Sequence, residues 1–395
     1  MLASIVVGLV FGFAPPCAAQ HKDPHVNCPY CNHVGFKVCK KHSKKQIAKF
    51  EESGAIFSSL LATCKECGGT LMVDCDKCDN VAVQDRIARR AKEIHDWLAE
   101  RRKTVDKLIQ HEVKHCESRW FRLTFDLKPM TVGRRKLPSW ELMYLYLKRF
   151  EEHRKYYKEV MQLTDTELPD KCDIYMWRDG RDQANAALKF TGMGSSGAGV
   201  KLMGISSVYT MHMQKRYITN DASLHRHMVH NITHLLTSQM SPANWIGKLK
   251  AGWLDAGLAH YFEFKLDKKC TTYCYQEVAT NRNFKGGKWL VPIRRMVAAG
   301  TRLPAFAAVA TKNTDQLMPK EHALSFSYVH FLLEGDFEND KVKEAGGRGK
   351  ALCQVVRAFK AKKPVRKALG GAYGWNALSF EEKWKEWVLR TYPVR

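Results

Sequence analysis

Three histidines within residues 224–240 have the spacing of metal ligands on a helix. His227, His230 and His234 lie three and four positions apart, so a helix would carry their side chains along one side. His230 and His234 would then lie one turn apart, which suits a two-histidine zinc site. The residue after His230 is the amide Asn231. The segment therefore predicts a metal-binding helix.

A second histidine pair lies in an intact His-Glu-x-x-His sequence, His111-Glu112-Val113-Lys114-His115. On a helix this motif binds zinc through both histidines, and the glutamate acts as general base. The charged segment 82–115 is predicted to form a long amphipathic helix that ends directly after the motif, and the flanks of the motif are polar. We interpret it as a chance match and keep His111, Glu112 and His115 as an alternative metal site. At the first pair, Asn231 stands in place of the glutamate.

Eight further candidate ligands form the most regular pattern in the chain. Each half reads C-x-x-C, seven residues, then C-x-x-[CH], with the ligands Cys28, Cys31, Cys39 and His42, then Cys64, Cys67, Cys75 and Cys78. Two-residue gaps let one tight turn supply two ligands to a tetrahedral zinc ion, and four such turns serve two ions. Seven cysteines cannot all pair in disulfides, because one would be left over. We therefore predict two structural zinc ions, with a redox or disulfide role as the alternative.

This segment resembles the cysteine-rich zinc domain of DnaJ-type chaperones over residues 28–78. The match is partial, because His42 replaces a cysteine and a helical-looking insert, 44–61, separates the halves. The resemblance implies that the outer knuckles share one ion and the inner knuckles the other. Spacing alone equally allows sequential pairing within each half. Chaperone activity is not implied, since no J-domain precedes the segment.

The composition describes a protein with a large core and a strong positive charge. The chain has 395 residues, 45% of them hydrophobic, and a formal charge of +24. Such a field attracts polyanions, although a general basic composition explains it equally. No basic motif with interleaved aromatic residues, typical of nucleic-acid binding, appears. We expect an acidic envelope polymer, or a peptide or protein, as the partner rather than nucleic acid.

The N-terminus indicates export. Residues 2–13 are apolar and lead into small residues up to Ala19, which is typical of a signal peptide cleaved there. No later stretch reaches the roughly 18 uninterrupted apolar residues of a membrane-spanning helix. We expect an exported protein, in the periplasm, in the cell envelope or outside the cell.

Strands and helices must position the histidine helix. Alternating apolar residues predict strands over 120–127, 172–177 and 207–213, and helical patterns cover 139–163, 182–190 and 253–263. The predicted units are a signal peptide (1–19), a two-zinc module (20–80), a charged helical arm (81–116), a sheet and metal-helix region (117–265) and a helical C-terminal subdomain (266–395).

These elements resemble the gluzincin metallopeptidases, in particular the peptidase MA-like domains of exported bacterial proteins, over about residues 117–335. The resemblance rests on the His230 and His234 pair followed by Leu235-Leu236, and on the helix Trp253-Leu-Asp-Ala-Gly-Leu-Ala-His-Tyr-Phe-Glu263. It implies an α+β, thermolysin-like fold with a small mixed sheet, active-site helices and a helical C-terminal part. It also implies a zinc site made of two histidines, a glutamate base and a third ligand just before Gly257.

By that resemblance the site has lost two of its four functional positions. His230 and His234 match the metal histidines, but Asn231 falls at the base and Ala256 at the third ligand. A neutral amide takes no proton from water, and alanine cannot coordinate a metal. His322 is the nearest equivalent of the tyrosine that stabilises the oxyanion in the family. We therefore predict a catalytically inactive pseudo-peptidase that binds a peptide, protein or envelope polymer.

A rebuilt site remains an alternative. His260 lies one turn after Ala256 and shares its helix face, so His230, His234 and His260 could hold a third zinc ion. Such an ion would still lower the pKa of bound water. An active hydrolase, or a polyanion-binding module, thus stays open, and the sequence does not decide whether the protein is an enzyme. It also leaves open the state of five other cysteines, Cys116, Cys172, Cys270, Cys274 and Cys353.

Overall fold

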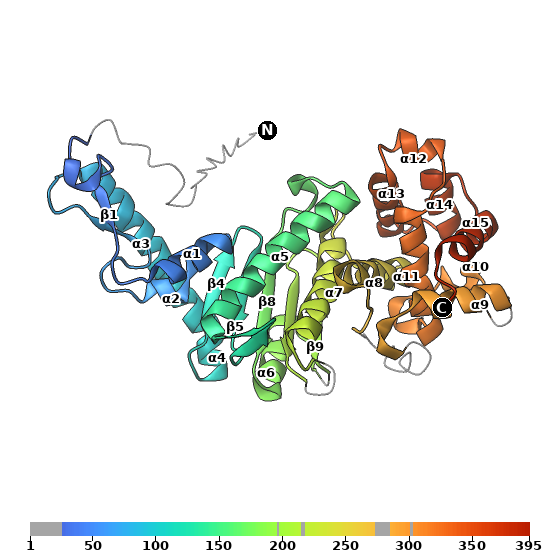
Figure 1. The fold of residues 1–395 in the computed structure, drawn as a ribbon, viewed down its shortest axis with the longest axis horizontal. Coiled ribbons are helices and arrows are strands. Elements are labelled where there is room, and N and C mark those ends of the chain that lie inside the picture. The colour runs from blue at the N-terminus through green and yellow to red at the C-terminus, as the bar shows by residue number, and fades with distance from the viewer. Residues whose placement is uncertain (1–25, 196, 215–217, 273–284, 301–302) are drawn as a thin grey trace, which may run out of the picture.

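The computed structural model of the chain describes residues 26–195, 197–214, 218–272, 285–300 and 303–395. Its fold is α+β, as the sequence predicts. In Figure 1 the cysteine-rich segment and the long helix α3 (Val81–Arg101) lie at one end, the main sheet in the middle and the C-terminal helices at the other end. The expected signal peptide falls outside the described residues.

The main sheet is mixed and has six strands in the order β2-β4-β5-β8-β10-β9. These strands are β2 (Ala55–Ser58), β4 (Lys114–Ser118), β5 (Phe121–Phe125), β8 (Cys172–Trp177), β10 (Val208–His212) and β9 (Gly199–Leu202). Strands β5, β8 and β10 run parallel, and the other pairings are antiparallel. The carboxyl ends of β5 and β8 therefore meet at one edge of the sheet.

Alternate side chains of β8 show which helices cover which face. Ile174 and Met176 pack in the main core with α5 (Ser139–Met161) and α7 (Asp221–Gln239). Tyr175 and Trp177 point to the opposite face, where they pack with α6 (Gly180–Thr191) and α4 (Lys107–Ile109). The period of two along a strand thus places the histidine helix α7 and the 107–109 segment on opposite sides of the sheet.

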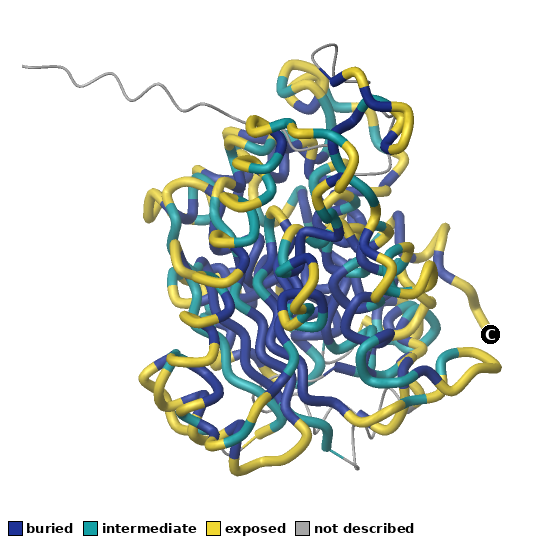
Figure 2. The backbone as a smooth tube through the Cα atoms, turned by 90° about the vertical axis from the view of Figure 1, so that its left-hand side faces the viewer, coloured by how far each residue is buried: buried dark blue, intermediate teal, exposed yellow. Residues whose placement is uncertain are grey.

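Most residues of helices α7, α8 (Gly252–Asp267) and α11 (Pro319–Glu334) are buried. Figure 2 shows a buried interior enclosed by more exposed segments. A Cβ atom at Gly257 of α8 would lie 2.4 Å from the backbone oxygen of Ser325 and 2.6 Å from Cγ2 of Val329. Only glycine permits this close approach of α8 to α11. Gly257 therefore lets α8 pack closely against α11.

The C-terminal part is helical, as predicted. Its helices beside α11 are α9 (Leu290–Ala299), α10 (Phe306–Val309), α12 (Asp340–Glu344), α13 (Arg348–Lys360), α14 (Val365–Tyr373) and α15 (Ala377–Thr391). Trp375, Trp384 and Trp387 are buried among them. These tryptophans pack the helices together.

The insert between the two cysteine halves belongs partly to the sheet. It was expected to be helical, but it contains α1 (Lys44–Glu52), β2 and α2 (Ser59–Ala62), and β2 pairs with β4. Phe50 of α1 packs edge-on against Tyr144 of α5, and the Tyr144 hydroxyl lies 2.6 Å from that of Ser58. The cysteine-rich segment is therefore tied to the main sheet through its own insert. Two smaller sheets complete the strands, β1 (Phe36–Val38) with β3 (Met72–Asp74) and β6 (Met130–Val132) with β7 (Arg135–Leu137).

The helix expected over 82–115 ends earlier. Helix α3 runs into a π-helical turn, Arg102–Asp106, and then α4, after which Gln110 takes a left-handed conformation with φ 63°. Residues 114–118 form β4 between β2 and β5. The pairing of both edges of β4 overrides the local helical pattern. The His-Glu-x-x-His sequence consequently spans a loop and a strand.

Candidate metal centres

The cysteine-rich segment gathers its eight candidate ligands into two groups that could each hold a metal ion. One consists of Cys28, Cys31, Cys75 and Cys78, and the other of Cys39, His42, Cys64 and Cys67. The antiparallel pairing of β1 with β3 brings the two halves of the segment together. The outer knuckles thus share one group and the inner knuckles the other, as the resemblance implies.

Distances within both groups fit tetrahedral zinc. Two sulfurs each about 2.3 Å from a tetrahedral ion are about 3.8 Å apart. Sγ–Sγ distances are 3.9 Å for Cys28–Cys75, 3.8 Å for Cys31–Cys78 and 3.9 Å for Cys39–Cys64, and His42 Nε2 lies 3.3 Å from Cys67 Sγ. The two groups therefore match zinc in both ligand type and separation.

The thiols of these groups lie too close together to ionise together without a cation. Burial and neighbouring cysteines raise the pKa of Cys78 to about 12, and burial raises that of Cys67 to about 12. Burial also raises the pKa of Cys31, but a hydrogen bond from the Gly35 N–H and bonds within the group outweigh it and bring the pKa to about 7. A zinc ion would stabilise the ionised thiols in both groups.

On α7, His230 and His234 point at each other inside the core. Their Nε2 atoms are 3.3 Å apart, and the two residues are 0% and 2% exposed. Two nitrogens each about 2.0–2.1 Å from a tetrahedral zinc ion are separated by about 3.3 Å. The pair therefore has the separation that a shared ion requires.

A buried carboxylate holds the far side of each ring. His230 Nδ1 lies 3.2 Å from Glu263 Oε2, and His234 Nδ1 lies 3.0 Å from Asp255 Oδ1. Both carboxylates come from α8. This is the arrangement in which a carboxylate fixes the tautomer and orientation of a metal-binding histidine.

The charge state of these carboxylates decides which ring nitrogens carry hydrogen. Burial raises the pKa of Glu263, but bonds from His230 and His260 outweigh it and hold the pKa at about 2. Burial likewise raises the pKa of Asp255, and His234 brings it below the ordinary value. Both are ionised near neutral pH, so Nδ1 of each ring donates and Nε2 of a neutral ring is a lone pair. Because two lone pairs face each other, a proton or a metal ion has to lie between them.

Backbone and side-chain donors fix the two carboxylates in turn. The N–H groups of Thr271 and Thr272 donate to Glu263 Oε1 at 2.6 and 2.8 Å. Trp245 Nε1 and Thr314 Oγ1 each donate to Asp255 Oδ2 at 2.9 Å. These bonds keep the carboxylates charged in a fully buried place.

The third ligand is arranged differently from the expected histidine triad. His260 Nδ1 lies 3.3 Å from Glu263 Oε2, and His230, His260 and Glu263 form a group that could hold a metal ion. His234 does not belong to that group, so His230 is shared between it and the His230–His234 pair. Ala256 is buried and offers no ligand atom.

The neighbours of the site also differ from a peptidase centre. Asn231 donates from Nδ2 to the backbone oxygen of His227 at 2.7 Å, and its Oδ1 accepts from Lys201 Nζ at 2.7 Å. His227 turns away to bond the Tyr209 hydroxyl. The ring of His322 lies 6.4 Å from that of His260, measured between centroids. A lysine ammonium thus occupies the place beside the residue that replaces the base.

The intact motif at 111–115 is dispersed. His115 is buried in β4, where Nε2 lies 2.8 Å from Asp106 and Nδ1 lies 3.1 Å from Thr124. Glu112 is exposed and pairs with Arg102 at 3.1 Å.

Within the described part of the chain, His111 forms a possible ligand group with Asp126 and Asp182, and not with His115. Burial, and then the charge of Asp179, raises the pKa of Asp182. The separation of His111 from His115 follows from the break after α4, which sends the two residues in different directions.

Sequence reasoning missed the carboxylates of both sites. Asp255 and Glu263 lie within the helix motif that was recognised, and their spacing on α8 relative to His260 was the available signal. Asp126 and Asp182 are 56 positions apart, so no local pattern could connect them. Among the other cysteines, Cys116, Cys172 and Cys353 are buried free thiols. Cys270 is buried too, and Cys274 lies outside the described residues.

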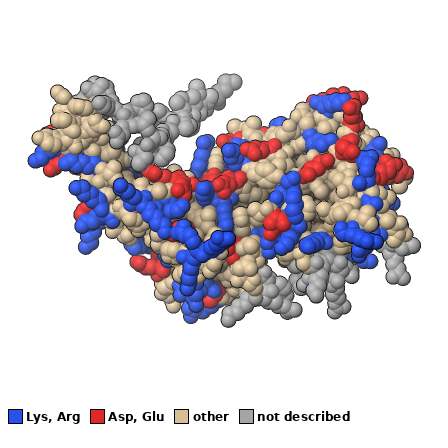
Figure 3. Space-filling view, in the orientation of Figure 1, with Lys and Arg blue, Asp and Glu red and all other residues tan. Residues whose placement is uncertain are grey.

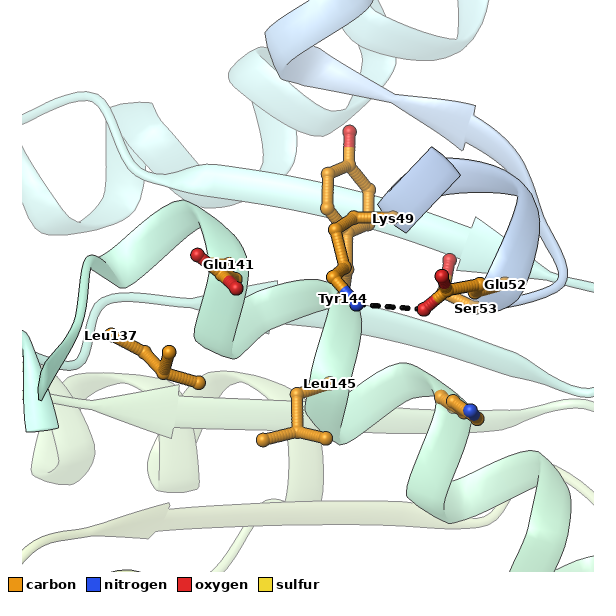
Figure 4. A pocket seen from close by; sticks show the side chains of 8 residues that line it. Lys49, Glu52, Ser53, Leu137, Glu141, Tyr144 and Leu145 are labelled. Carbon is orange, nitrogen blue, oxygen red and sulfur yellow. Dashed lines mark hydrogen bonds and ion pairs between the residues drawn. The ribbon is translucent and has the colours of Figure 1, made fainter. Parts of the chain in front are cut away.

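The described residues also line two hollows, a cavity and a wider groove. A cavity of about 90 Å³ lies between α1 and α5 and is lined by residues including Leu137, Tyr144 and Lys49, which is paired with Glu52 (Figure 4). A wider groove of about 420 Å³ lies beside Trp97 and Tyr175. Figure 3 shows basic and acidic side chains interspersed over the visible face.

Comparisons with known proteins give no family. None of the helices in the described residues is long and apolar enough to cross a membrane. The chain matches no protein-family model and no curated protein.

Proposed function

We propose that this protein is an exported, gluzincin-like pseudo-peptidase that binds zinc at His230 and His234 without hydrolysing peptides. Two further zinc ions would be held by the cysteine groups. The partner would be a peptide, a protein or an acidic envelope polymer. The observation that carries the proposal is the 3.3 Å separation of two Nε2 atoms whose rings are each held by a buried carboxylate.

Zinc fits this pair in three ways. Imidazole is a preferred zinc ligand, and the distance between the two Nε2 atoms equals that between two nitrogens on a tetrahedral zinc ion. Histidine must also be neutral to bind a metal ion. Burial lowers the pKa of His230 to about 3, so its ring is neutral near pH 7. Glu263 and Asp255 would orient the rings, and bound zinc would supply a fixed positive charge in the core.

The absence of a base supports a non-hydrolytic role. Asn231 is a neutral amide whose two polar ends are already bonded, one to backbone and one to Lys201. The carboxylates behind the two rings, Glu263 and Asp255, are held by the imidazoles and by further hydrogen-bond donors. None of these groups is placed to take a proton from water.

A peptide-hydrolysis assay tests this proposal. Zinc-replete full-length protein is incubated with a mixed peptide library, and cleavage is followed by mass spectrometry. We expect no cleavage above that of the His234→Ala variant. Cleavage that disappears in His234→Ala would overturn the pseudo-peptidase proposal, and cleavage that disappears in His111→Ala would move the active site to the 111–115 motif.

A rebuilt hydrolase is the second candidate, and one observation favours it. His230, His260 and Glu263 bring two imidazoles and a carboxylate to one place, which is the ligand set of several catalytic zinc sites. Under this alternative the His260→Ala variant would lose both a zinc ion and peptide cleavage. Retained zinc in His260→Ala would assign the ion to the His230–His234 pair.

A further inference from the structure

A second group of possible ligands lies on the other face of the sheet from α7. His111 follows α4, Asp126 follows β5, and Asp182 lies in the first turn of α6, which follows β8. Their candidate ligand atoms all lie within 4.8 Å of one another. This place is at the carboxyl ends of two parallel strands, where open α/β sheets commonly bind ligands.

The two carboxylates are buried and lack hydrogen bonds where they face His111. Asp182 is 1% exposed, and neither of its carboxylate oxygens has a hydrogen-bond partner in the described structure. Asp126 is 6% exposed, and its Oδ2 likewise has none. Burying such oxygens without a donor is unfavourable, and more so when they are charged. The arrangement therefore calls for a cation.

The histidine presents its Nε2 atom to these oxygens. His111 Nδ1 lies 3.1 Å from the backbone oxygen of Ile109, so Nδ1 carries a hydrogen and Nε2 is the nitrogen that faces the carboxylates. Nε2 lies 3.7 Å from Asp182 Oδ2 and 3.8 Å from Asp126 Oδ2, which is too far for a hydrogen bond. Two ligand atoms about 2.1 Å from one ion are about 3.0–3.4 Å apart, so the three atoms would draw together when they bind an ion.

The surroundings orient the ligands and leave an entrance. Arg178 donates to Asp126 Oδ1 at 2.7 Å and leaves Oδ2 directed at the group. The carbonyl of Ile109 holds the far side of the imidazole, as outer partners of metal-binding histidines do. The His111 side chain is 37% exposed, so an ion can reach the group from solvent.

We propose that His111, Asp126 and Asp182 bind a divalent cation of the manganese class. One imidazole and two carboxylates are a mostly oxygen ligand set, which suits Mn²⁺ better than the thiol-rich groups of the N-terminal segment do. The ion would tie α4 to α6 and to the end of β5. This site uses His111 without Glu112 or His115, so it is distinct from a His-Glu-x-x-His zinc site and independent of the proposed function.

Manganese binding to the full-length protein tests this site. The protein is purified without chelator and dialysed against Mn²⁺, and bound Mn²⁺ is measured by electron paramagnetic resonance and by metal analysis. We expect one Mn²⁺ per chain, with affinity reduced at least about ten-fold in Asp182→Asn and in His111→Gln. Glu112→Gln, an exposed change in the same loop, is the matched control and should bind as the wild type does.

Thermal unfolding gives a second reading. Asp182→Asn keeps the side-chain shape and removes a buried charge, so its melting temperature without added metal should not fall. Mn²⁺ should raise the melting temperature of the wild type and of Glu112→Gln, but not that of Asp182→Asn. Absence of Mn²⁺ binding, or equal binding by wild type, Asp182→Asn and His111→Gln, would overturn the proposal and leave a proton shared within the group.

Discussion

The two histidine pairs of this chain lie in opposite settings. The pair with the intact motif, His111 and His115, falls on a loop and a strand, where one ring is partly exposed and the other bonds Asp106. The pair with the altered motif, His230 and His234, lies on a buried helix with its Nε2 atoms 3.3 Å apart. A match to the five-residue motif is therefore weaker evidence for a metal site than a buried helix that brings two histidine rings together.

The difference also lies in what stands behind each ring. Both rings on α7 are held by carboxylates of α8, and these carboxylates accept further hydrogen bonds from backbone and side-chain donors. His115 has a carboxylate partner as well, but its second nitrogen faces Thr124 and not another histidine. A metal pair needs two oriented lone pairs directed at one point, and only α7 provides them among these two motifs.

Removing the carboxylate behind His230 should have the largest effect. Glu263→Ala would leave two imidazoles and the N–H groups of Thr271 and Thr272 without their buried acceptor, so we expect the free energy of unfolding to fall by about 3–5 kcal/mol. Chemical denaturation measures this. Glu112→Ala, at the exposed glutamate of the intact motif, is the control and should change stability by less than about 0.5 kcal/mol. Equal effects of both variants would remove the contrast between the motifs.

His115→Ala should cost stability but no metal. It would leave Asp106 buried without its partner and open a cavity in the sheet, so we expect a loss of about 2–3 kcal/mol. Zinc content should stay at the wild-type value. If His115→Ala lost one zinc ion per chain, the intact motif would be a metal site after all.

The anchoring of α7 should show as a dependence on acid. Arg149 holds Asp221, at the start of α7, through two bonds of 2.6 and 3.0 Å. Burial raises the pKa of Asp221, but Arg149 outweighs it and holds the pKa below its ordinary value. A carboxylate whose pKa is lowered in the folded state stabilises the fold at pH values above its pKa in the unfolded chain. This stability is lost as the pH falls below about 4.

Asp221→Asn should therefore destabilise the protein by about 1–2 kcal/mol at neutral pH and remove part of its acid sensitivity. Urea denaturation at several pH values measures both. Asp96→Asn, which changes an exposed pair with Lys92 on α3, is the control. An acid profile of Asp221→Asn that runs parallel to the wild-type profile would contradict this assignment.

Restoring the motif on α7 should have the smallest effect. In the wild type, Lys201 donates to Asn231. In Asn231→Glu the new carboxylate would form an ion pair with Lys201, so it would not be available as a general base. We expect no peptide cleavage from this variant. The matched test is Asn231→Glu combined with Lys201→Met, and cleavage by the single variant alone would show that Lys201 does not block the position.

Local signals predicted the elements well. The histidine segment forms the helix that was expected there, and the strand over 172–177 has the expected bounds. The end of the helix expected over 82–115 was misjudged, because the charged, helix-like pattern there carries no sign that β2 and β5 pair with both edges of β4. A local sequence pattern indicates the propensity of a segment but not which strands will pair with it.

Whether a site could be predicted depended on how far apart its residues lie in the sequence. Short, regular spacing predicted the ligand residues of the cysteine segment and the His230–His234 pair, whereas the grouping of the cysteines came from the resemblance. The carboxylates behind the pair lie on α8 and meet α7 only through the packing of these two helices. Asp126 and Asp182 meet only because β5 and β8 are parallel neighbours. The sequence did not predict the order of the strands in the sheet, and the meeting of these two residues depends on that order.

Zinc content tests the central proposal most directly. Purified full-length protein and its His234→Ala and His115→Ala variants are compared by metal analysis under identical conditions, with folding checked by circular dichroism. We predict that His234→Ala carries one zinc ion fewer than the wild type and that His115→Ala carries the same number. Equal zinc in the folded His234→Ala variant and in the wild type would contradict the assignment of a zinc ion to α7.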